Sequence, residues 1–122
     1  MGKKLSVFEL AAIALIFVTG LIHAINAPDS FQEAAYKGWL FCANAAGAVV
    51  AAFYISRQNR LGWWLGLGVA AGAFLGYVAS RTVGLPMIPA EPDAWLEPLG
   101  VASLIAEGLF IGIFIYWKSE VK

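Results

Sequence analysis

Four long apolar segments alternate with short polar ones along this chain of 122 residues. The apolar segments cover about 7–25, 39–55, 61–79 and 98–117. A helix needs about 20 apolar residues to cross a bilayer, and each segment is close to that length. The pattern predicts an all-α integral membrane protein, a four-helix bundle forming a single domain over 1–122 with no room for an extramembrane domain.

Two capping boxes mark helix starts in the sequence. Ser6 and Glu9 form a Ser-x-x-Glu box at the start of the first apolar segment, where each side chain can bond the other residue's backbone N–H. Ser30 and Glu33 repeat this spacing after that segment. The second box predicts a short interfacial helix that begins near Phe31, in the first loop of the outer face.

Charge divides the polar segments into two sets. The stretches 23–38 and 80–98 hold all five prolines, the only histidine and five of the eight acidic residues. Six of the eight bases lie elsewhere: Lys3, Lys4, Arg57, Arg60, Lys118 and Lys122. Short loops rich in Lys and Arg face the cytoplasm. Both termini are therefore predicted to be cytoplasmic. Two lysines before an apolar run also resemble a signal peptide, but no good Ala-x-Ala cleavage site follows, so we expect an uncleaved helix.

Composition narrows the possible partners. The chain is 61% hydrophobic and 13% charged, has no formal net charge and contains one cysteine. Soluble domains carry about 25% charged residues. The absence of a basic cluster or nucleic-acid motif argues against a nucleic-acid partner. We expect membrane lipid as a partner, with other membrane subunits or further copies of the chain, in a bacterial or archaeal cytoplasmic membrane.

Small residues recur every fourth position in the last two apolar segments. They are Gly68, Gly72, Gly76 and Ser80 in the third segment, and Gly108 and Gly112 in the fourth. Such stripes let helix backbones approach closely in lipid. Packing within the bundle is the favoured interpretation, and a dimer face is the alternative. The third segment is expected to be the most enclosed helix, and Gly72→Leu is expected to disrupt packing on either interpretation.

Four ionisable residues on or below the outer face are candidate ligand-binding residues: His23, Arg81, Glu97 and Glu107. Glu107 lies near mid-bilayer, where an isolated carboxylate is costly. Each residue also has a structural interpretation. His23 can be an interfacial hydrogen-bonding residue, and Arg81 can pair with Glu97 to fix the second outer loop. His23 is a weak metal ligand on its own, because zinc sites use three or four protein ligands.

The second outer loop contains four prolines, at 86, 89, 92 and 98. This density disfavours regular helix and predicts a stiff lid, with a tight turn at Gly84. The segment Ser80-Arg81-Thr82-Val83-Gly84-Leu85-Pro86, followed by Glu97-Pro98, resembles the outer loop of a group of small uncharacterised bacterial four-helix membrane proteins. The resemblance implies the same topology and no particular activity. Relatives often have glycine directly after Leu-Pro, where this chain has Met87.

Three functions remain open from the sequence. The favoured one is a non-enzymatic accessory or structural subunit of a larger membrane complex. The second is a binder of a small ligand, metal or haem under the outer lid, although one histidine per chain would give a haem only one protein ligand. The third is a proton or small-solute pathway that uses Glu107 and His23. No cofactor is identified, and no nucleophile–base pair indicates catalysis.

Overall fold

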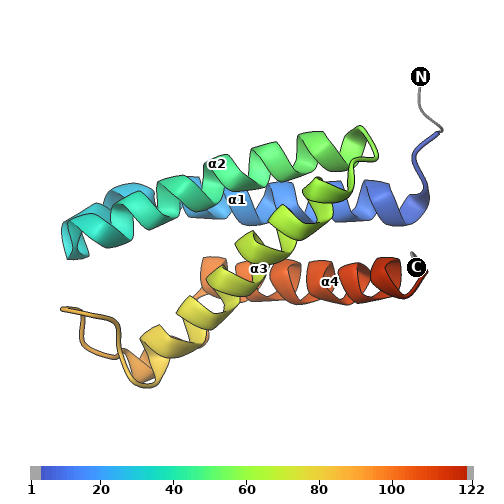
Figure 1. The fold of residues 1–122 in the computed structure, drawn as a ribbon. Helices are drawn as coiled ribbons and strands as arrows, with labels where there is room; N and C mark the ends of the chain where they lie inside the picture. Colours follow the sequence, from blue (N-terminus) through green and yellow to red (C-terminus); the bar gives the residue numbers. More distant parts are fainter. Residues whose placement is uncertain (1–3, 121–122) are drawn as a thin grey trace.

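The computed structural model describes residues 4–120, so Lys3 and Lys122, two of the bases used to orient the chain, lie outside the described residues. Four helices make up the fold: α1 (Val7–Glu33), α2 (Ala35–Ser56), α3 (Arg60–Arg81) and α4 (Pro98–Glu120) (Figure 1). A short 3-10 helix, η1 (Pro92–Ala94), lies in the loop before α4. Each of the four long helices is long and apolar enough to cross a membrane, and each contains one predicted span.

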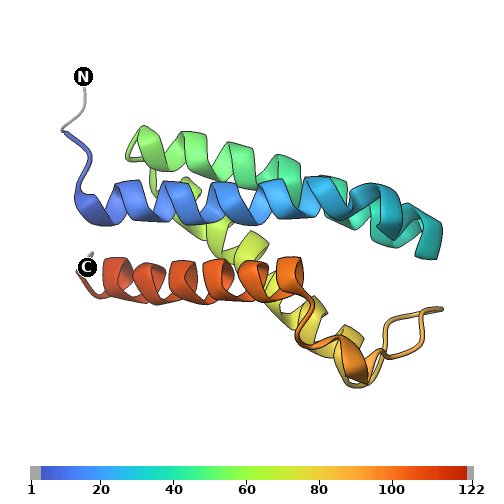
Figure 2. The same cartoon turned by 180° about the vertical axis from the view of Figure 1, so that it is seen from behind.

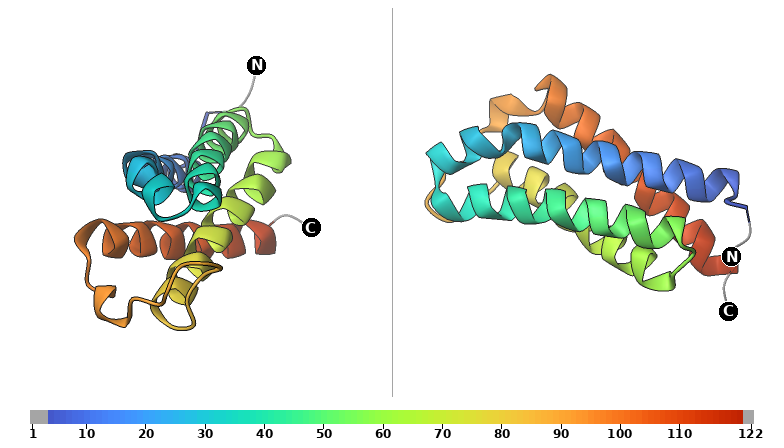
Figure 3. Two further views of the ribbon diagram at one scale, coloured as in Figure 1. Left: turned by 90° about the vertical axis from the view of Figure 1, so that its left-hand side faces the viewer. Right: turned by 90° about the horizontal axis from the view of Figure 1, so that it is seen from above.

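The helices form a ring in which α3 is tilted. α1 and α2 pack along each other as a hairpin, α4 lies beside α1, and α3 crosses obliquely between α2 and α4 (Figures 1 and 2). The start of α1 and the end of α4 lie at one end, here called the terminal end (Figure 2). The opposite end, called the loop end, holds the α1–α2 connection and the loop of residues 82–97 (Figure 3).

The first helix begins as predicted and ends later than predicted. The Ser6–Glu9 capping box is present, with both reciprocal hydrogen bonds. The second box is not, because α1 continues through Pro28 to Glu33 and the Ser30 hydroxyl donates to Asn26 O instead. The predicted short helix near Phe31 is therefore part of α1. Proline is tolerated inside membrane helices because neighbouring groups compensate for the lost hydrogen bond.

A one-residue connection joins α1 to α2, and a short turn joins α2 to α3. Ala34 is extended, with φ −166° and ψ 140°, which breaks the helix between Glu33 and Ala35. In the second turn Gln58 has a positive φ of 57°, and the side chain of Asn59 caps α3 by accepting from Leu61 N. Gln58 Nε2 also donates to Glu9 Oε1, which ties this turn to the start of α1.

The buried core lies mainly toward the terminal end. Aromatic side chains fill the space between α3 and α4, where Trp63 stacks on Trp117 with ring centroids 5.0 Å apart and also contacts Phe110. Glycines bring the helices close in this half: a Cβ on Gly62 would lie 2.5 Å from Ile55 N. Such contacts hold the four helices together near the termini.

Candidate functional site

A cavity of about 560 Å³ lies between α2 and α3 and extends along α3 from Trp64 to Arg81 at the loop end. This feature is called the α2–α3 groove. α2 and α3 supply most of its lining. α1 adds His23, the loop of residues 82–97 adds Leu85, and α4 adds Ser103. The tilt of α3 creates this space, because α3 diverges from α2 as it leaves the tightly packed terminal half (Figure 1).

One wall of the groove is a strip of bare helix backbone. Gly68, Gly72 and Gly76 line the groove, and a Cβ placed on any of them would meet nothing within 4 Å among the described residues. These positions therefore do not pack another helix of the chain, contrary to the favoured interpretation of the stripe. Space at Gly72 also removes the reason to expect that Gly72→Leu disrupts packing within the chain.

Other glycines make the close helix contacts. A Cβ on Gly66 would lie 2.5 Å from the Phe110 ring, and one on Gly20 would lie 2.6 Å from Ala48 Cβ. The expectation that the third segment is the most enclosed helix is wrong, since a smaller share of α3 is buried than of any other long helix. Gly108 and Gly112 on α4 also face open space, and they do not line the groove.

The groove is apolar along most of its length and polar at the loop end. Trp64, Leu65 and Val69 line the end nearer the core, beside the glycine strip. Five side chains with hydroxyl or cationic groups line the other end: Tyr36, Lys37, Tyr77, Ser80 and Arg81. The groove therefore presents separate apolar and polar regions, an arrangement suited to an amphipathic molecule.

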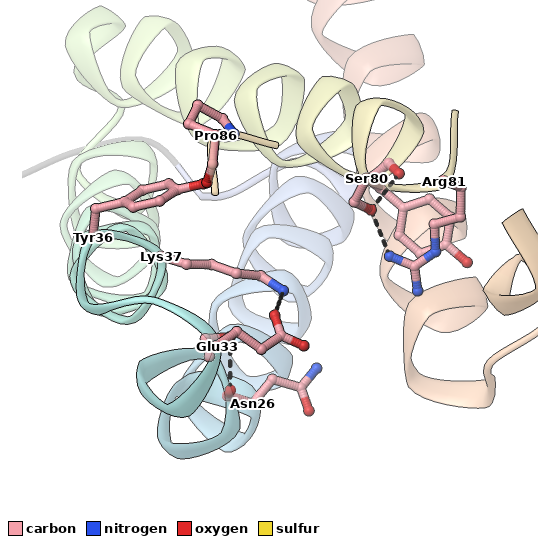
Figure 4. Close-up of polar contacts among 9 residues, drawn as sticks. Asn26, Glu33, Tyr36, Lys37, Ser80, Arg81 and Pro86 are labelled. Atoms are coloured by element: carbon pink, nitrogen blue, oxygen red, sulfur yellow. Dashed lines mark hydrogen bonds and ion pairs between the residues drawn. The ribbon is translucent and has the colours of Figure 1, made fainter. Parts of the chain in front are cut away.

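Arg81 is held in place by α3 and by the loop that precedes α4. Its Nε donates to Ala94 O at 3.2 Å, its Nη1 donates to Ser80 Oγ at 2.7 Å, and its Cζ lies 3.8 Å above the Tyr77 ring centre. Figure 4 shows Arg81 beside Ser80 at the end of α3. Arg81 thus holds the second outer loop, but it does so through the backbone carbonyl of Ala94 and not through the carboxylate of Glu97.

Glu97 does not pair with Arg81. Its Oε1 accepts a hydrogen bond from Gly100 N at 2.9 Å, which caps the start of α4. Acidic side chains are favoured at this position because they satisfy a free backbone N–H at a helix N-terminus. Glu97 is exposed and does not line the groove, so the predicted ion pair is wrong and the carboxylate has a structural role.

Two groove residues at the start of α2, Tyr36 and Lys37, contact the loop of residues 82–97 and the end of α1. Lys37 forms an ion pair with Glu33 one turn earlier, across the α1–α2 connection (Figure 4). The Tyr36 hydroxyl donates to Pro86 O at 2.5 Å, which joins α2 to the tip of the 82–97 loop. This loop turns at Gly84, whose φ is +88° as its predicted turn requires. The loop therefore bridges the groove at its polar end.

His23 lies on the α1 side of the groove and is mostly buried. Its Nδ1 lies 2.8 Å from Thr19 O, and its ring centre lies 4.8 Å from that of Phe41. When Nδ1 carries the proton, this contact is a hydrogen bond and Nε2 is left as an acceptor. The interfacial hydrogen-bonding role predicted for His23 is consistent with this contact.

Glu107 lies in the interior behind the groove and is 1% exposed. Ser103, which lines the groove, donates its hydroxyl to Glu107 Oε2 one turn along α4. Within residues 4–120, Oε1 has no hydrogen-bond partner. Of the four ionisable candidates, His23 and Arg81 thus line the groove. Glu107 does not line it but contacts the lining residue Ser103, and Glu97 lies outside it.

Sequence reasoning missed several polar members of the groove, namely Tyr36, Lys37, Tyr77 and Ser103. Two tyrosines and a lysine at span ends are typical membrane-interface residues, so their types gave no separate signal. Ser103 lies one helical turn before Glu107, and this spacing could have identified it as the hydrogen-bond partner of a buried acid.

The part of the chain that the structure describes contains no cluster of three or more His, Cys, Asp or Glu side chains suited to a metal ion. Cys42 is a half-buried free cysteine. Comparisons of the chain with protein-family models, curated proteins and solved structures found no match. The class of protein therefore follows from fold and site: a protein with four helices fit to cross a membrane and a groove between two of them.

Proposed function

We propose that this integral membrane protein binds an amphipathic, lipid-like molecule in the α2–α3 groove. The observation that carries the proposal is the open glycine strip at 68, 72 and 76, opposite α2 and continuous with a polar end. In a bilayer such a space is filled either by another helix or by hydrocarbon chains. The polar end favours a molecule that has both a chain and a headgroup.

The dimensions of the groove support this occupant. Its volume of about 560 Å³ lies within the usual range for ligand sites, about 300–1,000 Å³. From Trp64 to Arg81 the α3 wall extends roughly 25 Å at about 1.5 Å per residue. One leaflet contributes about 15 Å of hydrocarbon to a bilayer. An acyl chain can therefore lie along the glycine strip while its headgroup reaches the polar end.

The proposed orientation places both termini in the cytoplasm. Three bases lie at the terminal end, namely Arg57, Arg60 and Lys118. This supports the orientation because short segments rich in Lys and Arg face the cytoplasm. The polar end of the groove then lies at the outer membrane surface, with the connection between α1 and α2 at the interface. The groove consequently takes its ligand from the outer leaflet.

The proposal is one of binding, not of catalysis. The accessory-subunit hypothesis stays a prediction, and co-purification with larger membrane subunits is its test. Membership of the bacterial group with the Ser-Arg-Thr-x-Gly-Leu-Pro loop also stays a prediction. A proton or solute pathway through Glu107 finds less support, because Glu107 is buried behind Ser103 and does not line the groove.

Lipid retention in native mass spectrometry tests the proposed function. The detergent-purified protein is delipidated and titrated with phospholipid, and bound lipid is counted for the wild type, Gly72→Leu and Gly108→Leu. Leucine at 72 occupies the groove, whereas leucine at 108 enters equivalent open space on α4 outside it. We expect Gly72→Leu to weaken lipid binding about tenfold, the effect of losing about 1.4 kcal/mol.

The Gly108→Leu variant is the matched control and should bind lipid as the wild type does. Circular dichroism and gel filtration verify that both variants retain the helical fold. Equal lipid binding by all three folded proteins would contradict a site in the groove.

A further inference from the structure

We infer that the groove selects phospholipids whose headgroup carries a net negative charge, and that Arg81 is the principal residue that binds this headgroup. This inference rests on the proposed function, because it names the class of lipid for the same groove. It follows from the charges that line the polar end, from the hydrogen-bond donors of Arg81 and from the position of the loop.

The charge of the lining is one-sided. Lys37 on α2 and Arg81 on α3 both line the groove, and no carboxylate is among the described lining residues. Lys37 is already paired with Glu33, which lies outside the lining, so its charge is largely compensated. Arg81 has no carboxylate within ion-pair distance in residues 4–120. The uncompensated positive charge of the groove therefore belongs to Arg81.

The Arg81 guanidinium is also preorganised. Contacts with Ala94 O, Ser80 Oγ and the Tyr77 ring hold its plane, and they occupy two N–H donors. A guanidinium has five such donors in a planar fork that matches the oxygens of a phosphate. Three donors are thus available to a headgroup, and little side-chain entropy is lost when they bind.

The position of the loop gives the bound lipid a direction. Leu85 lines the groove, and the bond from Tyr36 to Pro86 O closes the loop over the same end as Arg81. A phosphate beside Arg81 therefore lies under the loop, and its acyl chain lies along the glycine strip. With both termini in the cytoplasm, the headgroup then lies at the outer membrane surface and the acyl chain points toward the bilayer centre, as in a lipid of the outer leaflet.

A zwitterionic phospholipid is a poorer match for the same end. Its phosphate can meet Arg81, but its ammonium would then lie near the uncompensated charge of Arg81, with no carboxylate among the described lining residues to receive it. Like charges placed together discriminate against the wrong ligand. A net-anionic phospholipid avoids this repulsion, and its second polar group can bond the free N–H donors.

A competition between two phospholipids tests the inference. The delipidated wild type is offered an equimolar mixture of phosphatidylglycerol and phosphatidylcholine with identical chains, and bound lipid is counted by native mass spectrometry. We expect phosphatidylglycerol to be enriched about fivefold, the effect expected of one interfacial cation. Arg81→Gln should abolish the enrichment while phosphatidylcholine still binds.

Two further variants separate the binding role from a structural one. Arg60→Gln removes a cation at the other end of α3 that does not line the groove, and it should keep the wild-type enrichment. Arg81→Lys keeps the charge without the fork and should retain part of the enrichment. If Arg81→Gln does not fold, the Lys variant still tests the inference, because an enrichment equal to that of the wild type would contradict the role of the fork.

The remaining outcomes are decisive as well. If the wild type shows no preference while Gly72→Leu still loses lipid, this inference is wrong and the proposed function stands. If oleate competes with phosphatidylglycerol as well as phosphatidylglycerol itself does, a carboxylate suffices and the assignment to a phospholipid is overturned. If Gly72→Leu binds lipid as the wild type does and Arg81→Gln keeps the wild-type enrichment, both proposals are contradicted.

Discussion

At the scale of single residues, burial and hydrogen bonding separate the four ionisable side chains that the sequence singled out. Arg81 uses part of its guanidinium to hold the loop, and it also lines the groove. Glu97 is used by the backbone of α4, and Glu107 is turned into the interior against Ser103. Sequence position identifies where such residues lie along a helix, but not which face they occupy in a tilted bundle.

The Ser103 hydroxyl is predicted to stabilise the fold through Glu107. Ser103→Ala leaves Glu107 Oε2 without its donor in the buried interior. Hydrogen bonds between polar side chains inside membrane proteins contribute about 1 kcal/mol. We therefore expect the free energy of unfolding of Ser103→Ala, measured in mixed micelles, to be about 1 kcal/mol lower than that of the wild type.

Ser56→Ala is the matched control for this measurement. Ser56 also donates its hydroxyl along its own helix, to Phe53 O, but it is exposed at the end of α2. Its replacement should change the free energy of unfolding by less than half as much. Equal losses in the two variants would show that burial of the Glu107 carboxyl adds nothing to the Ser103 bond.

At the scale of elements, the apolar pattern predicted all four helices because a bilayer sets their length. The end of α1 was missed because a proline and a capping box usually mark a boundary, whereas here the chain continues as helix through Pro28. The glycine stripe on α3 was predicted to be a face for close helix packing, whereas Gly68, Gly72 and Gly76 line the groove. Its sequence could not show whether a helix or open space lies against that face, since both need small residues.

The loop of residues 82–97 is predicted to depend on one side chain of α2. Tyr36→Phe removes the hydrogen bond to Pro86 O, while the bonds of the loop to α3 remain. We expect hydrogen exchange to become several-fold faster at the Leu85 and Ile88 amides, which bond each other's carbonyls across the turn.

Tyr116→Phe provides the corresponding control. Tyr116 lies on α4 near the terminal end, and its hydroxyl has no hydrogen bond among residues 4–120. Exchange in the loop should be unchanged in this variant. A loop equally protected in the Tyr36 variant would mean that α2 does not hold it.

At the scale of the whole molecule, unequal packing along the bundle produces the groove. Aromatic residues and close glycine contacts hold the four helices at the terminal end, and the tilt of α3 opens the loop end. The sequence predicted the number of helices and the sidedness of the charges. The tilt escaped prediction because it results from contacts between distant residues, such as Gly66 against Phe110.

The proposed orientation is predicted to be visible in thiol labelling. In a Cys42→Ala background, single cysteines replace Asp93 in the loop and Ser119 near the end of α4, both of which are exposed. A membrane-impermeant maleimide should label position 93 in intact cells and position 119 only after permeabilisation. The reverse pattern would place the polar end of the groove in the cytoplasm and contradict an outer-leaflet ligand.

The central claim is that a lipid occupies the α2–α3 groove, and photo-crosslinking of the wild-type protein tests it most directly. A phospholipid with a diazirine on its acyl chain is added at near-stoichiometric amounts to delipidated protein, and the adducts are mapped by mass spectrometry. We predict adducts concentrated on residues 64–76 of α3 and on the facing side of α2. Labelling of residues 108–112 of α4 to the same extent would contradict the claim, because that face is equally open but lies outside the groove.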